Sequence, residues 1–169
     1  MQIQEIQNRI NKYPQIALQG KKIAESESNH FVCKGVCSSA NALLMGALQN
    51  KIQKNILIIW SDTEQARYLF ADLLTLSQPV LFFPTSYRKK KIFDDALSIQ
   101  RNETLSTLIA QPSQPHIIVT YPEAIAEVTP TKQLLQDDIL HFNVGQTIPI
   151  STLIDQLLER KFVQVDFVY

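Results

Sequence analysis

One stretch, residues 31–48, constrains the fold of this chain more than any other. It reads Phe-Val-Cys-Lys-Gly-Val-Cys-Ser-Ser-Ala-Asn-Ala-Leu-Leu-Met-Gly-Ala-Leu, which predicts a strand over 31–34, a tight loop and then a helix. Gly35 begins the loop. In a phosphate-binding loop the first Gly is followed, after four residues, by a second Gly, a Lys and a Ser or Thr, which correspond here to positions 40, 41 and 42. Those three positions hold Ala40, Asn41 and Ala42.

These three residues remove the chemistry of a phosphate loop. In a working loop the second Gly lets backbone N–H groups close on the phosphates, the Lys neutralises them and the hydroxyl holds Mg²⁺. At ~1.5–3 kcal/mol for each lost charge-assisted contact, losing the Lys and the metal ligand costs roughly 3–6 kcal/mol, or about 10² to 10⁴ in affinity. We therefore expect no nucleotide cofactor here. On spacing alone, Gly35 is explained more simply as a tight strand-to-helix turn in an unrelated α/β domain.

The composition indicates a globular chain without a generally basic surface. With 169 residues, of which 45% are apolar and 19% charged, the chain is long enough for one full α/β domain and a fragment of a second. Sixteen basic residues balance sixteen acidic ones, so any contact with nucleic acid is confined to a local patch.

Nothing in the sequence indicates export, a membrane span or a metal site. The first residues lack the apolar core and cleavage site of a secretory signal, and no apolar run approaches membrane-spanning length. Cys33 and Cys37 lie four apart with no second pair to complete a zinc site, and the three histidines are scattered. We expect a cytoplasmic protein with free thiols; a strained local disulfide or a metal site is the alternative.

Hydrophobic patterns along the rest of the chain predict alternating strands and helices. Helices are expected over the first dozen residues and over 16–23, from 40 to about 49, from 61, from about 96, and over 153–158. Strands are expected at 56–60, 80–83 and 117–120, and two alternating segments at 140–144 and 163–167. This order predicts a parallel sheet with helices on both faces, so that strand 56–60 is covered on both sides. We place a domain boundary at Gly145, giving domains of 1–145 and 146–169.

Details of the helices are also predicted. Ser61 to Glu64 and Thr120 to Glu123 have the spacing of capping boxes. In the helix from about residue 96, four apolar residues are expected to face inward and two charged ones to lie elsewhere on the surface; these are Leu97, Leu105, Leu108 and Ile109, and Arg101 and Glu103.

No catalytic residue emerges from the acidic positions. Asp62 could hold Mg²⁺ after strand 56–60, but it falls in the first turn of a helix, where a carboxylate is favoured by the helix dipole. The pairs Asp94-Asp95 and Asp137-Asp138 are more typical of solvated turns than of acid/base chemistry.

The densest charge lies between two aromatic residues, Tyr87 and Phe93. It is the run Arg88, Lys89, Lys90 and Lys91. Such a run could contact a DNA backbone, but four charges without a basic surround bind weakly, and a solvated loop is the simpler interpretation. A third possibility is pairing with acidic residues of a partner domain.

Four segments together resemble one family. They are Gly-Val-Cys-Ser-Ser-Ala-Asn-Ala-Leu-Leu (35–44), Leu-Phe-Phe-Pro-Thr-Ser-Tyr-Arg (81–88), Ile-Val-Thr-Tyr-Pro-Glu-Ala-Ile-Ala-Glu (118–127) and the ending Leu-Leu-Glu-Arg-Lys-Phe-Val-Gln-Val-Asp-Phe-Val-Tyr. In this order they look like the amino-terminal module of bacterial transcription-repair coupling factors (Mfd). The resemblance covers nearly the whole chain. Two of its features, the cysteine-flanked loop and the Tyr-Arg-Lys that follows the Phe-Phe-Pro strand, look most like the Bacteroidetes branch.

The resemblance implies a helicase-like P-loop fold similar to that of the repair protein UvrB, with a degenerate loop and no ATPase activity. UvrB has an intact phosphate loop where this chain has Ala40, Asn41 and Ala42, so ATP chemistry does not carry over. In that family the whole protein is an ATP-driven DNA translocase that displaces stalled RNA polymerase and recruits UvrA. ATP and Mg²⁺ belong to its motor domains.

The same resemblance implies the partners. UvrA is contacted through an inserted second domain, whose first residues begin near Ser151 and which continues past residue 169; RNA polymerase and DNA are contacted through other domains. We expect residues 1–169 to be monomeric and to be no enzyme. The alternative is a nucleotide-binding helicase-like domain that tolerates the altered loop.

Overall fold

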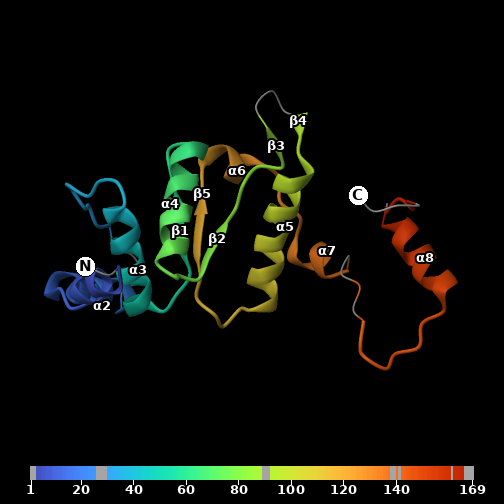
Figure 1. Cartoon of the computed structure of the whole chain (residues 1–169), viewed down its shortest axis with the longest axis horizontal. Helices are drawn as coiled ribbons and strands as arrows, with labels where there is room; N and C mark the ends of the chain where they lie inside the picture. The colour runs from blue at the N-terminus through green and yellow to red at the C-terminus, as the bar shows by residue number, and fades with distance from the viewer. Residues whose placement is uncertain are drawn as a thin grey trace. The chain divides into compact units, whose positions relative to one another are not determined.

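The computed structural model describes residues 3–25, 30–88, 92–137, 140, 142–160 and 162–165 (Figure 1). The chain divides into two compact units, Met1–Val128 and Thr129–Tyr169, each described here by itself. The boundary predicted at residue 145 falls inside the second unit and stays a prediction.

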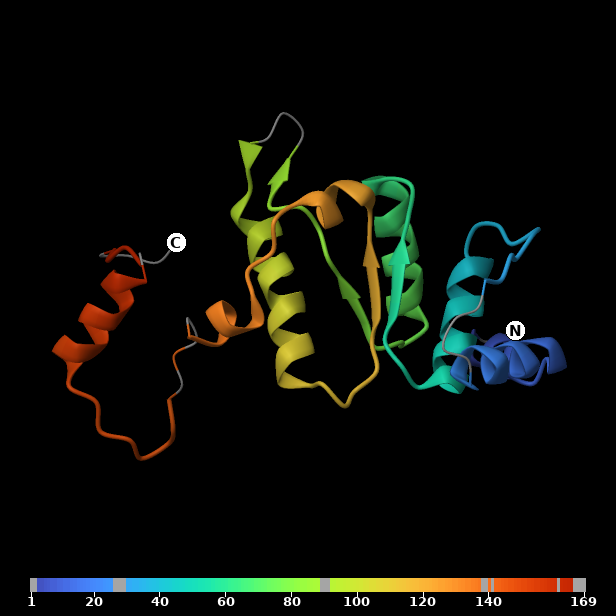
Figure 2. The same ribbon diagram turned by 180° about the vertical axis from the view of Figure 1, so that it is seen from behind.

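The first unit contains a three-stranded parallel sheet with helices packed on it. Its elements in chain order are α1 (Ile3–Asn11), α2 (Pro14–Glu25), α3 (Ala40–Ile52), β1 (Ile56–Ile59), α4 (Thr63–Thr75), β2 (Val80–Phe82), β3 (Tyr87–Arg88), β4 (Ile92–Phe93), α5 (Asp95–Ala110), β5 (Ile117–Thr120) and α6 (Pro122–Ala126). The strand order is β1-β5-β2, and all three strands run in the same direction, as the arrows in Figures 1 and 2 show. The predicted α/β class and the three strand positions are confirmed.

Helices α4 and α5 cover opposite faces of the sheet at β2. The Phe82 ring lies 5.3 Å from that of Phe70 on α4, while the next side chain, Phe83, lies under the guanidinium of Arg101 on α5. Successive side chains of a strand point to opposite faces, so the two helices lie on different sides. The buried core includes Ala66, Leu69 and Leu73 of α4, and Ala42 of α3 also belongs to it.

Strand β1 is covered on one face only. Ile58 is buried among the core residues, but Leu57 and Ile59 are each more than half exposed. The prediction that β1 is covered on both faces is therefore wrong within the described residues. That prediction came from the unbroken apolar run, and such a run does not show whether one face of a strand is buried or both.

The predicted strand over 31–34 does not form. Residues 30–37 are irregular, and Val32 is 68% exposed. The segment instead lies beside α2 and α3, which pack so closely that a Cβ at Gly20 would stand 2.7 Å from Lys51 Cβ. A strand needs a hydrogen-bonded neighbour, and among the described residues none lies next to 31–34.

The second unit contains α7 (Lys132–Asp137) and α8 (Ile150–Glu159). Helix α8 matches the predicted helix over 153–158, and α7 was not predicted. The strand expected over 140–144 is wrong, because Asn143 to Gln146 form a turn in which Gly145 has φ +87°. Residues 162–165 have no regular structure, so the strand expected from 163 does not form there either; Phe167 lies outside the described residues.

No helix in the described part of the chain is long and apolar enough to cross a membrane.

Candidate functional site

The segment from Gly35 to Asn41 forms one wall of the site. Gly35 has φ +80°, a conformation that L side chains rarely adopt, and nothing approaches its missing Cβ. The glycine is therefore required by the backbone turn rather than by a close approach. This confirms the predicted tight turn, which here follows an irregular segment instead of a strand.

The turn uses the N–H groups that a phosphate loop would offer to its ligand. Ala40 donates its backbone N–H to the Cys37 carbonyl at 3.2 Å, and Asn41 donates its own to the Ser38 carbonyl at 3.1 Å. The Asn41 side-chain amide turns back to the same Ser38 carbonyl at 3.0 Å. An anion at this turn would compete with internal acceptors for these donors.

Positions 41 and 42 point in different directions. Asn41 lines a hollow beside the turn, whereas Ala42 is completely buried and belongs to the core. A hydroxyl at position 42 would thus face apolar side chains of the sheet instead of a metal ion.

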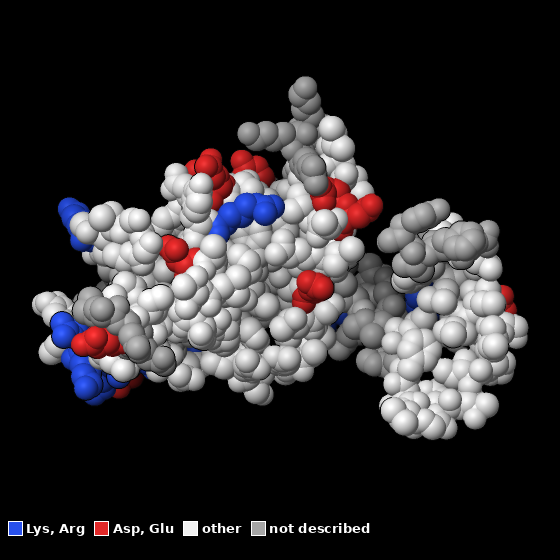
Figure 3. All heavy atoms as spheres, in the orientation of Figure 1, with Lys and Arg blue, Asp and Glu red and all other residues white. Residues whose placement is uncertain are grey.

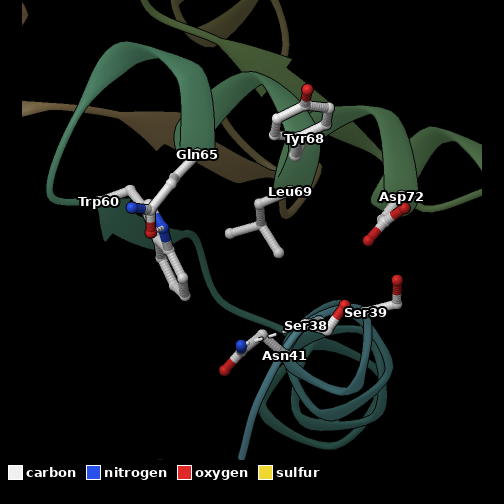
Figure 4. A pocket seen from close by; sticks show the side chains of 8 residues that line it. All are labelled: Ser38, Ser39, Asn41, Trp60, Gln65, Tyr68, Leu69 and Asp72. Atoms are coloured by element: carbon white, nitrogen blue, oxygen red, sulfur yellow. Dashed lines mark hydrogen bonds between the residues drawn. The ribbon is translucent and has the colours of Figure 1, made fainter.

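The hollow encloses about 320 Å³ between this turn and α4 (Figure 4). It is lined by Ser38, Ser39, Asn41, Trp60, Gln65, Tyr68, Leu69 and Asp72. The Trp60 indole lies at one end, where its Nε1–H donates to Gln65 Oε1 at 2.8 Å. At the other end the Asp72 carboxylate and the Ser39 hydroxyl point toward one another. Asn41 was the residue expected at this place; the α4 residues were missed, because tertiary packing alone brings them to the turn.

Asp62 caps α4 rather than holding a metal. Its Oδ1 accepts the Gln65 backbone N–H at 2.9 Å, and its Oδ2 accepts the Ser61 hydroxyl at 3.2 Å. The Gln65 N–H is the main reason why the pKa of Asp62 lies below its usual 3.8. The helix-start interpretation is confirmed, but the predicted Ser61–Glu64 capping box is wrong, because the cap is one residue later.

This cap predicts a pH-dependent stability. We expect Asp62→Ala to lower the melting temperature at pH 7, because a backbone N–H of α4 loses its acceptor. A carboxyl with a depressed folded pKa stabilises above its unfolded pKa, and this contribution is lost as the pH falls through the folded value. The difference from wild type should therefore shrink below about pH 4. Asp62→Asn, which still caps, is the control; a pH-independent Ala effect would contradict the assignment.

The other predicted acidic and basic residues do not gather at this hollow. Asp94 caps α5 through the Leu97 N–H at 3.0 Å, so it is not one of a catalytic pair with Asp95. The side chain of Asp137 and all of Asp138 lie outside the described residues. Lys89, Lys90, Lys91 and the Arg88 side chain also lie outside the described residues, so the prediction for the basic run stays a prediction.

The face of the molecule drawn in Figure 3 shows no broad basic patch. On this face Lys and Arg atoms lie at the end where α1 and α2 are and also near the middle, while Asp and Glu atoms are spread over it, with several at the end of α4 and beside the β3–β4 hairpin. Both cysteines are free and exposed, and the described residues hold no group of three His, Cys, Asp or Glu side chains that could bind a metal.

A second polar cluster, which sequence reasoning missed, lies at the carboxyl ends of β2 and β5. Arg101 is only 4% exposed, although we expected it on the surface of its helix. Its Nη1 donates to the carbonyls of Pro84 (2.7 Å) and Ala124 (3.0 Å), and its Nη2 donates to the Glu127 carbonyl (3.1 Å). The guanidinium carbon also lies 4.0 Å from the centre of the Phe83 ring. Arg101 therefore ties α5 to the end of β2 and to α6.

The same cluster fixes the base of the β3–β4 hairpin. The Glu127 carboxylate accepts the backbone N–H and the hydroxyl of Ser86, and the Tyr121 hydroxyl accepts the Thr85 N–H at 3.0 Å. Burial lowers the pKa of Arg101, and the nearby Glu127 charge opposes that shift. Thr120 donates to the Phe83 carbonyl, so its predicted capping role is wrong. Since every member is engaged in holding backbone, this cluster is structural.

Comparisons with models of protein families, with curated proteins and with solved structures find no match for this chain.

Proposed function

We propose that residues 1–169 are a non-catalytic interaction module, the amino-terminal UvrB-like module of a bacterial transcription-repair coupling factor. In this proposal the helicase-like P-loop domain is degenerate and cytoplasmic. The ATP-driven removal of stalled RNA polymerase belongs to motor domains elsewhere in the parent protein.

The observation that carries the non-catalytic part is the geometry of residues 37–42. The backbone N–H groups of Ala40 and Asn41 are taken by carbonyls within the turn, and the residue at 42 faces the core. The hollow beside the turn contains a carboxylate, and among the described residues that line it none is Lys or Arg. Such a site repels the triphosphate that a working loop attracts.

The family assignment is supported by the four sequence segments quoted above and is compatible with the parallel three-stranded sheet. Fold alone does not imply function, so the assignment depends on partner binding. The second candidate, a nucleotide-binding domain that tolerates the altered loop, has in its favour only the hollow beside Asn41.

UvrA binding tests the family assignment. We expect immobilised residues 1–169 not to retain UvrA, because the contacts in the resembling family lie in the inserted domain that begins near Ser151. A chain extended through that domain should retain it. Failure of the extended chain would contradict the assignment, and tight binding by residues 1–169 would overturn the boundary on which it depends.

A further inference from the structure

We draw no further inference here: the strongest candidate, the uncovered face of strand β1 at the edge of the sheet, where Leu57 and Ile59 are more than half exposed, carries no proposal because nothing in the described part of the structure shows what lies on it.

Discussion

Replacing Arg101 with Met is expected to lower the free energy of unfolding by about 3–5 kcal/mol. Met fills much of the same space but donates no hydrogen bond, so the carbonyls of Pro84, Ala124 and Glu127 lose their shared donor. The Glu127 carboxylate also loses the positive charge beside it. Urea denaturation followed by far-UV circular dichroism measures this change.

Two further variants show whether the guanidinium shape matters. Arg101→Lys keeps the charge but cannot reach three carbonyls from a planar fork or stack in the same way on Phe83, so it should recover only part of the loss. Glu103→Gln, an exposed change on the same helix, should stay within roughly 0.5 kcal/mol of wild type. A Met variant as stable as the Glu103 control would show that the buried network does not hold α5 to the sheet.

The position of Arg101 could have been found from helical periodicity. Residues 97, 101, 104 and 108 follow a spacing of three to four, so Arg101 shares the face of Leu97 and Leu108. Charged side chains are seldom buried without partners, so a place on this face is unusual for an arginine. The partners of Arg101 are backbone carbonyls from two distant loops, and they could not be predicted from the residues around Arg101 in the sequence.

The sequence was sufficient to predict those helices and strands whose structure depends mainly on their own residues. The three apolar runs became β1, β2 and β5, and the amphipathic segments before and after them became helices. The segment 31–34 differs, because its apolar and β-branched residues suit a strand but a strand also needs a neighbour with free backbone groups. Pairing is a tertiary property, and it was not predictable from those four residues.

One wall of the candidate site could also be predicted from the sequence, and the other could not. The turn at Gly35 follows from the spacing alone, and so does the prediction that Asn41 cannot neutralise a phosphate. The opposite wall, with Trp60 and Asp72, depends on how α4 packs beside the turn. The burial of Ala42 also depends on that packing. Because of this burial, a hydroxyl introduced at position 42 would face the core and not a metal ion.

Introducing the three phosphate-loop residues together is expected not to create ATP hydrolysis. Ala40→Gly and Asn41→Lys would add backbone freedom and a charge, but Ala42→Thr would put a hydroxyl into the core, at a cost of about 1–3 kcal/mol. Asp62 is already committed to the α4 cap, and we identify no residue to position the attacking water. If the triple variant released phosphate from ATP faster than the wild type, the chain would contain catalytic groups that we have not identified.

The largest effect concerns the unmodified turn. Compared with a phosphate loop that has its Lys and its metal-binding hydroxyl, this turn is expected to lack roughly 3–6 kcal/mol of nucleotide binding, or about 10² to 10⁴ in affinity. The Ala40 and Asn41 N–H groups are already bonded within the turn, and the Asp72 carboxylate in the adjacent hollow adds repulsion.

Calorimetric titration of residues 1–169 with ATP and Mg²⁺ tests this central claim most directly. We predict no saturable heat below the millimolar range, and the same result for Asp72→Asn, because removing one repulsive charge does not supply the missing donors. Saturable micromolar binding to the wild-type chain would contradict the account.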